Sequence, residues 1–117
     1  MVTMRILLIA LASMTGVAAH AQTDPSFAPC AVCHTVKPGQ NRLGPTLAGV
    51  VGRKKAAVAN FNYSPAFKAQ KGVWTEAELD AFLANPRAKV PGTRMVYVGM
   101  PDKAKRAKLI AWLKAQR

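Results

Sequence analysis

Apolar and polar positions of this chain recur with a helical period in three segments, and no segment alternates long enough to build a sheet. The clearest helix begins at Thr75, where Thr-Glu-Ala-Glu forms a capping box that satisfies backbone N–H groups of the first turn. The helix ends at the Asn-Pro pair of positions 85 and 86, because the residue before a proline disfavours helix. Its apolar residues lie at positions i, i+3 and i+4 of one face: Leu79, Phe82 and Leu83.

Two more helices flank this one. A shorter helix begins at Ser64 with Pro65 in its first turn and stops at Gly72. A longer helix over residues 102–116 carries one broad apolar face, formed by Leu109, Ile110, Trp112 and Leu113. Its basic residues lie mostly away from that face: Lys103, Lys105, Arg106 and Lys108. Glycine and proline pairs mark the loops between, so the pattern predicts a small, all-α, loop-rich domain without internal repeats.

The N-terminus has the pattern of a secretory signal peptide. A basic Arg5 precedes an apolar run over residues 6–19, and Ala19-His20-Ala21 is a small-residue cleavage pattern. An uncleaved membrane anchor is the alternative, but the run is short for a span of about 20 residues. We therefore divide the chain into a signal peptide over residues 1–21 and one domain over residues 22–117, which is periplasmic or otherwise exported.

Charge narrows the class of partner. The formal net charge of the chain is +12, and it is +11 once Arg5 leaves with the signal peptide. Strongly basic domains bind nucleic acid, anionic lipid or acidic proteins. Because export excludes nucleic acid, we expect acidic protein partners, with peripheral membrane contact as a further option. Solvated basic surfaces without any docking role explain the same charge equally well.

The main candidate for chemistry is Cys30-Ala31-Val32-Cys33-His34, the spacing that covalent attachment of a c-type haem requires. Each thiol would form a thioether with one vinyl group, and the imidazole would ligate iron. A thioredoxin-like dithiol, a structural disulfide or half of a zinc site are the alternatives. The first lacks a βαβ context, and a zinc site lacks further ligands, because the only other histidine is His20 in the signal peptide.

Further motifs follow this pentapeptide in an order that resembles class I cytochrome c of the mitochondrial type and its bacterial counterparts. The resemblance covers nearly all of residues 30–114 and rests on Leu43-Gly44-Pro45-Thr46-Leu47, Gly52-Arg53-Lys54, Tyr63, Trp74, Asn85-Pro86 and Pro91-Gly92-Thr93-Arg94-Met95. It implies one covalently attached haem c and helices wrapped around it.

The same resemblance implies the ligands of the iron. His34 matches the axial imidazole and would donate its other ring N–H to the backbone carbonyl of Pro45. Met95 matches the axial thioether, a soft neutral sulfur that favours ferrous iron. Core packing is the alternative for Met95, and it is the role we expect of Met100.

The resemblance also implies a second set of haem contacts. Tyr63 and Trp74 match residues whose polar hydrogens reach a haem propionate, Arg53 matches a compensating basic residue, and Thr93 matches a cofactor contact. Ordinary core aromatics and a surface arginine are the alternative. The chain departs from the family at Phe82, where mitochondrial members have a tyrosine, and at Phe67, which replaces a polar residue. Pro29 also shortens or breaks the N-terminal helix, leaving Phe27 to supply its apolar contact.

These features favour a soluble, monomeric one-electron carrier over an enzyme. It would shuttle electrons between exported or membrane-bound redox proteins, such as acidic reductases, oxidases or dehydrogenases, with Arg87 and Arg94 near an exposed haem edge. The alternative is a peroxidase-like haem enzyme or gas sensor with an open sixth position. The domain has no second histidine to act there as an acid or base.

Overall fold

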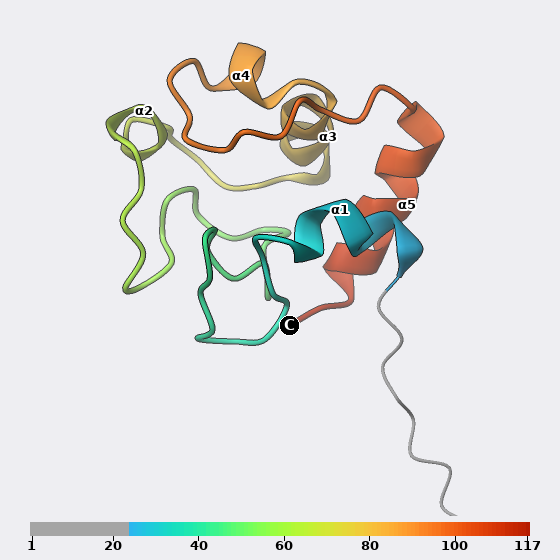
Figure 1. The fold of residues 1–117 in the computed structure, drawn as a ribbon, viewed down its shortest axis with the longest axis horizontal. Coiled ribbons are helices and arrows are strands. Elements are labelled where there is room, and N and C mark those ends of the chain that lie inside the picture. The colour runs from blue at the N-terminus through green and yellow to red at the C-terminus, as the bar shows by residue number, and fades with distance from the viewer. Residues whose placement is uncertain (1–23) are drawn as a thin grey trace, which may run out of the picture.

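The computed structural model describes residues 24–117, and within this range the chain is helical and has no strand. Its elements are η1 (Pro25–Phe27), α1 (Ala28–Ala31), α2 (Pro65–Lys68), α3 (Glu76–Ala84), α4 (Pro86–Lys89) and α5 (Lys103–Lys114), and long loops lead from α1 to α2 and from α4 to α5 (Figure 1). This confirms the predicted all-α, loop-rich class. The signal peptide lies outside the described residues. In the described part, no helix is long and apolar enough to span a membrane.

Helices α3 and α5 form the centre of the core. Both begin where the sequence predicts, because Thr75 Oγ1 accepts from the N–H of Glu78 at 3.1 Å and Asp102 Oδ1 accepts from the N–H of Lys105 at 3.1 Å. Their apolar faces pack on each other and are buried: Leu79, Phe82 and Leu83 from α3, and Leu109, Ile110 and Leu113 from α5. The helical period therefore identified the core correctly.

Arg106 is the exception to the predicted solvated side of α5. It is buried, donates from Nε to Asp80 Oδ1 at 2.7 Å, and donates from Nη1 to the carbonyls of Met100 and Pro101 at 2.8 and 2.9 Å. A buried guanidinium needs such partners, and the loop before α5 supplies two of them. Arg106 thus ties α5 to α3 and to the end of the loop that follows α4.

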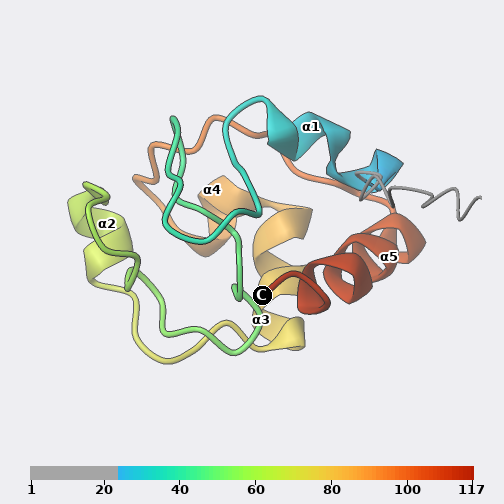
Figure 2. The ribbon, with the colours of Figure 1, turned by 90° about the horizontal axis from the view of Figure 1, so that it is seen from below.

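The N-terminal helix is broken, as predicted. It consists of the single turn η1 and the four residues of α1, with Pro25 and Pro29 in the first turns. Figure 2 shows this segment beside α5, and the rings of Phe27 and Trp112 lie 4.9 Å apart. Phe27 is buried and supplies the apolar contact expected of it.

Helix α2 is shorter than predicted, ending at Lys68 instead of Gly72. The chain leaves the helix early because Gly72 and Val73 pair with Lys55 and Lys54, and that pairing requires a turn. Helix α4 was not predicted. Asn85 caps it by accepting from the N–H of Ala88 at 3.3 Å, so this residue ends one helix and begins another.

Candidate haem site

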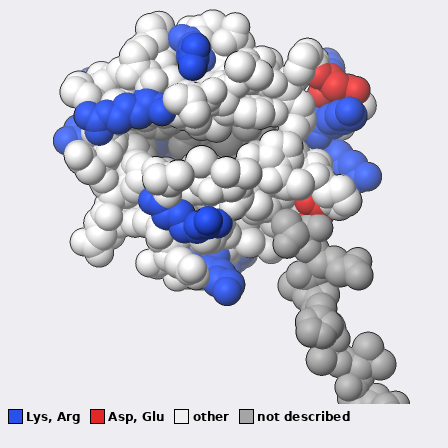
Figure 3. Space-filling view, viewed as in Figure 1, with Lys and Arg blue, Asp and Glu red and all other residues white. Residues whose placement is uncertain are grey.

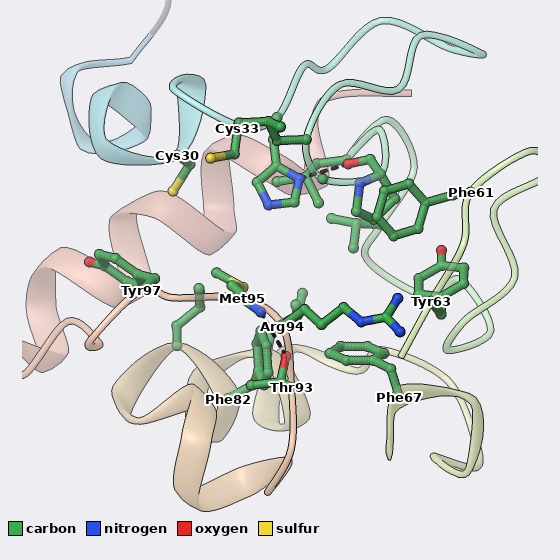
Figure 4. Close-up of a pocket in the computed structure, with 18 of the residues that line it drawn as sticks. Cys30, Cys33, Phe61, Tyr63, Phe67, Phe82, Thr93, Arg94, Met95 and Tyr97 are labelled. Carbon is green, nitrogen blue, oxygen red and sulfur yellow. Dashed lines mark hydrogen bonds between the residues drawn. The ribbon is translucent and has the colours of Figure 1, made fainter. Parts of the chain in front are cut away.

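A cavity of about 780 Å³ opens between the loops and the α3–α5 core. Figure 3 shows the molecule hollowed on this face, with Lys and Arg side chains on both sides of the hollow. In Figure 4 the two cysteines lie on one side of the cavity, and Thr93 and Met95 lie on the other. Apart from its sulfur and imidazole groups, the lining is dominated by aliphatic and aromatic side chains.

The two cysteines and His34 are placed by one helical turn. The backbone N–H groups of Cys33 and His34 both donate to the carbonyl of Cys30, at 3.1 and 2.9 Å. This turn presents both thiols and the imidazole to the cavity. The thiols are free and half-buried, and burial, aided by the nearby Cys33, raises the pKa of the Cys30 thiol.

His34 is held in one tautomer. Its Nδ1 lies 2.7 Å from the carbonyl oxygen of Pro45, and because a carbonyl only accepts, Nδ1 carries the proton. Nε2 is then the ring nitrogen with a free lone pair, as metal ligation requires. Burial lowers the pKa of His34 and outweighs the opposing effect of the Pro45 carbonyl, so the neutral ring is favoured. A Cβ at Gly44 would overlap this ring, so only glycine fits beside it.

Met95 lines the cavity on a loop without regular structure. Thr93 stabilises the approach to it, because Thr93 Oγ1 accepts from the N–H of Met95 at 3.2 Å. The same loop is fixed downstream, where the N–H of Met100 donates to the carbonyl of Leu83 at 2.8 Å. Met100 itself is buried in the core and does not line this cavity, in agreement with its expected packing role.

Arg53, Tyr63 and Trp74, which the resemblance assigned to the haem propionates, all line the cavity. Arg53 donates from Nη1 to the carbonyls of Thr46 and Ala48 at 2.8 and 3.0 Å. Its Nε is buried and has no hydrogen-bond partner among residues 24–117. The hydroxyl of Tyr63 accepts from the N–H of Val58 at 3.1 Å, so its own proton remains available to donate.

Aromatic rings form the rest of this wall, and the sequence pattern did not assign them to the site. Phe67 packs edge-on against Phe82, with centroids 5.7 Å apart and planes at 87°, and it also contacts Tyr63 and Trp74. Phe61 packs on Tyr63 at 4.9 Å. Phe61 could have been found from its i, i+2 spacing to Tyr63, which places both rings on one side of an extended segment.

These residues fit a covalently attached haem. The cavity volume lies in the range of sites for ligands and cofactors. Two thiols and a neutral imidazole border it on one side and a thioether on the other, and the orphaned Arg53 Nε is a donor that a carboxylate would satisfy. A zinc site fits poorly, since no cluster of three or more His, Cys, Asp or Glu side chains occurs among the described residues.

Comparison with known proteins decides the family. No family model matches the chain. Cytochrome c2 of Rhodomicrobium vannielii is 40% identical over 99% of this chain and 98% of its own length. Cytochrome c2 iso-2 of Magnetospirillum fulvum is 40% identical over 81% of this chain and 99% of its own length. The chain belongs to the class I cytochromes c. The cytochrome cy of Rhodobacter capsulatus is 49% identical, but the chain spans only 42% of that longer protein.

A solved structure agrees with this family. Cytochrome cH from Methylobacterium extorquens superposes with a TM-score of 0.72 at 43% identity, over 76% of this chain and 90% of that one. As a class I cytochrome c, the protein carries one covalently attached haem c and transfers electrons, and Cys30 and Cys33 fit the motif that attaches the haem. It is an electron carrier and not an enzyme.

Proposed function

We propose that this cytochrome is a one-electron shuttle whose iron is ligated by His34 and Met95. The observation that carries the proposal is the arrangement of the cavity: the cysteines lie on one side and the Met95 thioether on the other, and the neutral imidazole of fixed tautomer that follows Cys33 lines the same apolar space. The haem, when bound, supplies an iron that changes valence without gaining or losing a ligand.

The side chains around the cavity prepare it for this task. The contact from His34 to Pro45 fixes the ring orientation, and the hydrogen bond from Met95 to Thr93 fixes the backbone that presents the thioether. Aromatic rings exclude water from one wall, which lowers the local dielectric and favours the less charged ferrous state. Arg53, Tyr63 and Trp74 line the cavity and would receive the haem propionates, a role that the unpartnered Nε of Arg53 supports.

The surface suits acidic partners. Arg94 lines the cavity and is exposed, so it offers a positive charge where a haem edge would emerge, and Arg87 adds an exposed positive charge on α4. Family members carry electrons between membrane complexes. We therefore infer membrane-bound reductases, oxidases or dehydrogenases with acidic docking surfaces as partners, a monomeric carrier, and export to the periplasm after cleavage at residue 21.

Met95→Ala in the haem-loaded protein tests the ligand assignment. The sulfur-to-ferric charge-transfer band should disappear, and the reduced protein should then bind carbon monoxide, because the sixth position is open. Met100→Leu is the matched control, since Met100 is a core residue outside the cavity, and it should keep the band. A band that survives in Met95→Ala and disappears in Met100→Leu would contradict the proposal.

A further inference from the structure

The segment of residues 54–73, called here the 54–73 loop, forms one wall of the cavity. It carries Phe61, Tyr63 and Phe67, and in Figure 1 it is the green and yellow-green strip that includes α2. Backbone pairing closes its base: Lys54 and Val73 form an isolated antiparallel bridge, and the N–H of Trp74 donates to the carbonyl of Arg53 at 2.8 Å.

Lys55 is an unusual residue at this base. It is only 7% exposed, whereas its neighbour Lys54 lies on the surface. Its Nζ lies 3.1 Å from Glu78 Oε2 and 4.9 Å from the centroid of the Trp74 ring. Burial of an ammonium is costly unless it is paired, and these two contacts supply the pairing. Lys55 thus connects the base of the loop to α3 and to a ring that lines the cavity.

Glu78 extends this connection to a second helix. A capping box would direct its carboxylate to the N–H of Thr75, but that N–H donates to the carbonyl of Val73 instead. The carboxylate accepts from Lys55 and, at 3.0 Å, from Lys89 Nζ of α4. Lys55, Glu78 and Lys89, called here the charge clamp, therefore join the loop base, α3 and α4.

We propose that the charge clamp holds the 54–73 loop against α3 and so keeps Trp74 and the aromatic wall closed over the haem cavity. Lys55 and Glu78 are positioning residues for electron transfer. They do not contact Met95 or His34, and they act through Trp74 and the 54–73 loop. The inference deepens the proposed function, on which it rests for the role of the cavity.

The clamp acts at the base of the loop and not at its tip. The tip has its own attachment, because Asn41 Nδ2 donates to the carbonyls of Ala59 and Asn60 at 3.1 and 3.3 Å. Loss of the clamp should therefore loosen the pairing around Trp74 while the tip stays attached. Water would reach the wall at this point and stabilise the more charged ferric state, which lowers the reduction potential.

Hydrogen exchange and potentiometry of the haem-loaded protein test the clamp. The variants are Lys55→Met and Glu78→Gln, which keep side-chain length but remove one charge each, and Lys55→Arg, which keeps the charge. Lys54→Met is the matched control, because it removes the same charge from the adjacent, exposed position. The probes are the amides of Gly52 and Trp74, which form the base pairing, and the amide of Met100 as an internal reference.

We expect the amides of Gly52 and Trp74 to exchange about tenfold faster or more in Lys55→Met and Glu78→Gln, because a buried partner loses its ion pair. The reduction potential should fall in both variants. Lys55→Arg and Lys54→Met should leave the exchange rates and the potential near the wild-type values, and the Met100 amide should not respond.

Two results would overturn the proposal. One is base-amide exchange in Lys55→Met and Glu78→Gln that is no faster than in Lys54→Met. The other is a potential that rises in Glu78→Gln, since that sign is expected when a lost negative charge acts on the iron directly and the wall does not move. The exchange measurement does not depend on which residue ligates iron, so it can fail or succeed separately from the Met95→Ala test.

Discussion

Replacement of Arg106 by methionine should destabilise the protein severely, although the residue lies on a helix whose other basic side chains are exposed. Methionine keeps an unbranched stem and the helix propensity, so the change mainly removes the guanidinium. Two carbonyls, of Met100 and Pro101, then lose a charged donor that now lies 2.8 and 2.9 Å away. Hydrogen bonds to charged groups contribute about 1.5–3 kcal/mol each, so the loss of two is roughly 3–6 kcal/mol.

Thermal unfolding of the haem-loaded protein, followed by far-UV circular dichroism, measures this loss. A domain of this size loses about 4 °C or more in Tm per kcal/mol, so Arg106→Met should lower Tm by about 12 °C or more. Asp80→Asn is the matched comparison, because it removes only the negative charge of the partly exposed partner at Nε and leaves both carbonyl contacts in place. Asp80→Asn should therefore lower the Tm much less than Arg106→Met.

Equal destabilisation by Asp80→Asn and Arg106→Met would contradict this expectation. In that case the ion pair between α3 and α5 would dominate, and the carbonyl contacts would contribute little. Because Met100 ends the loop that presents Met95, Arg106→Met should also weaken the sulfur-to-ferric charge-transfer band before global unfolding. Asp80→Asn should leave the band unchanged.

Three further outcomes follow from the site and the surface. Gly44→Ala should lower the free energy of unfolding by about 1–3 kcal/mol, because a methyl group at this position overlaps the His34 ring. The Soret band should also shift, and an unchanged absorption spectrum would contradict this prediction. Hydrogen bonds from lysine and arginine side chains hold the pKa values of Glu78 and Asp80 below the ordinary carboxyl range, so the native state binds fewer protons than the unfolded state. Their contribution to stability is therefore complete above that range and lost as the pH falls through the lowered values, which acid titration of the unfolding free energy would show. The rate constant for association with an acidic redox partner should fall steeply as the salt concentration rises. Stopped-flow rate constants that do not depend on ionic strength would show that the basic surface serves solubility alone.

Local signals predicted the parts of the fold that local forces determine. Ser64, Thr75 and Asp102 each cap a helix with their own side chain, and a cap requires no knowledge of distant residues. The end of α2 required such knowledge, because the chain turns there to pair with Lys54. A helix signal at Ser64 could give the start of this element but not its length.

The errors at buried charges have a different cause. Arg106 was placed on the solvated side because of its charge, although it lies at i−3 and i−7 from Leu109 and Leu113 and so shares their face. Position should have outweighed residue type. Lys55 offered no comparable signal, since it stands in an irregular loop beside another lysine and its partner Glu78 is 23 residues away.

Polarity is divided unequally within the cavity, and this division follows from the departures at positions 67 and 82. Phe82 stands where mitochondrial members have a tyrosine, and Phe67 stands where they have a polar side chain. The two phenylalanine rings pack edge-on against each other. Elsewhere the lining keeps polar hydrogens, and those of Arg53, Tyr63 and Trp74 would serve the propionates. Phe67 and Phe82 offer no hydrogen bond to the Met95 sulfur, so we expect the reduction potential to depend on keeping that aromatic wall closed more than on a hydrogen bond to sulfur. A charge clamp outside the cavity suits such a site, because it closes the wall without placing a polar group inside it.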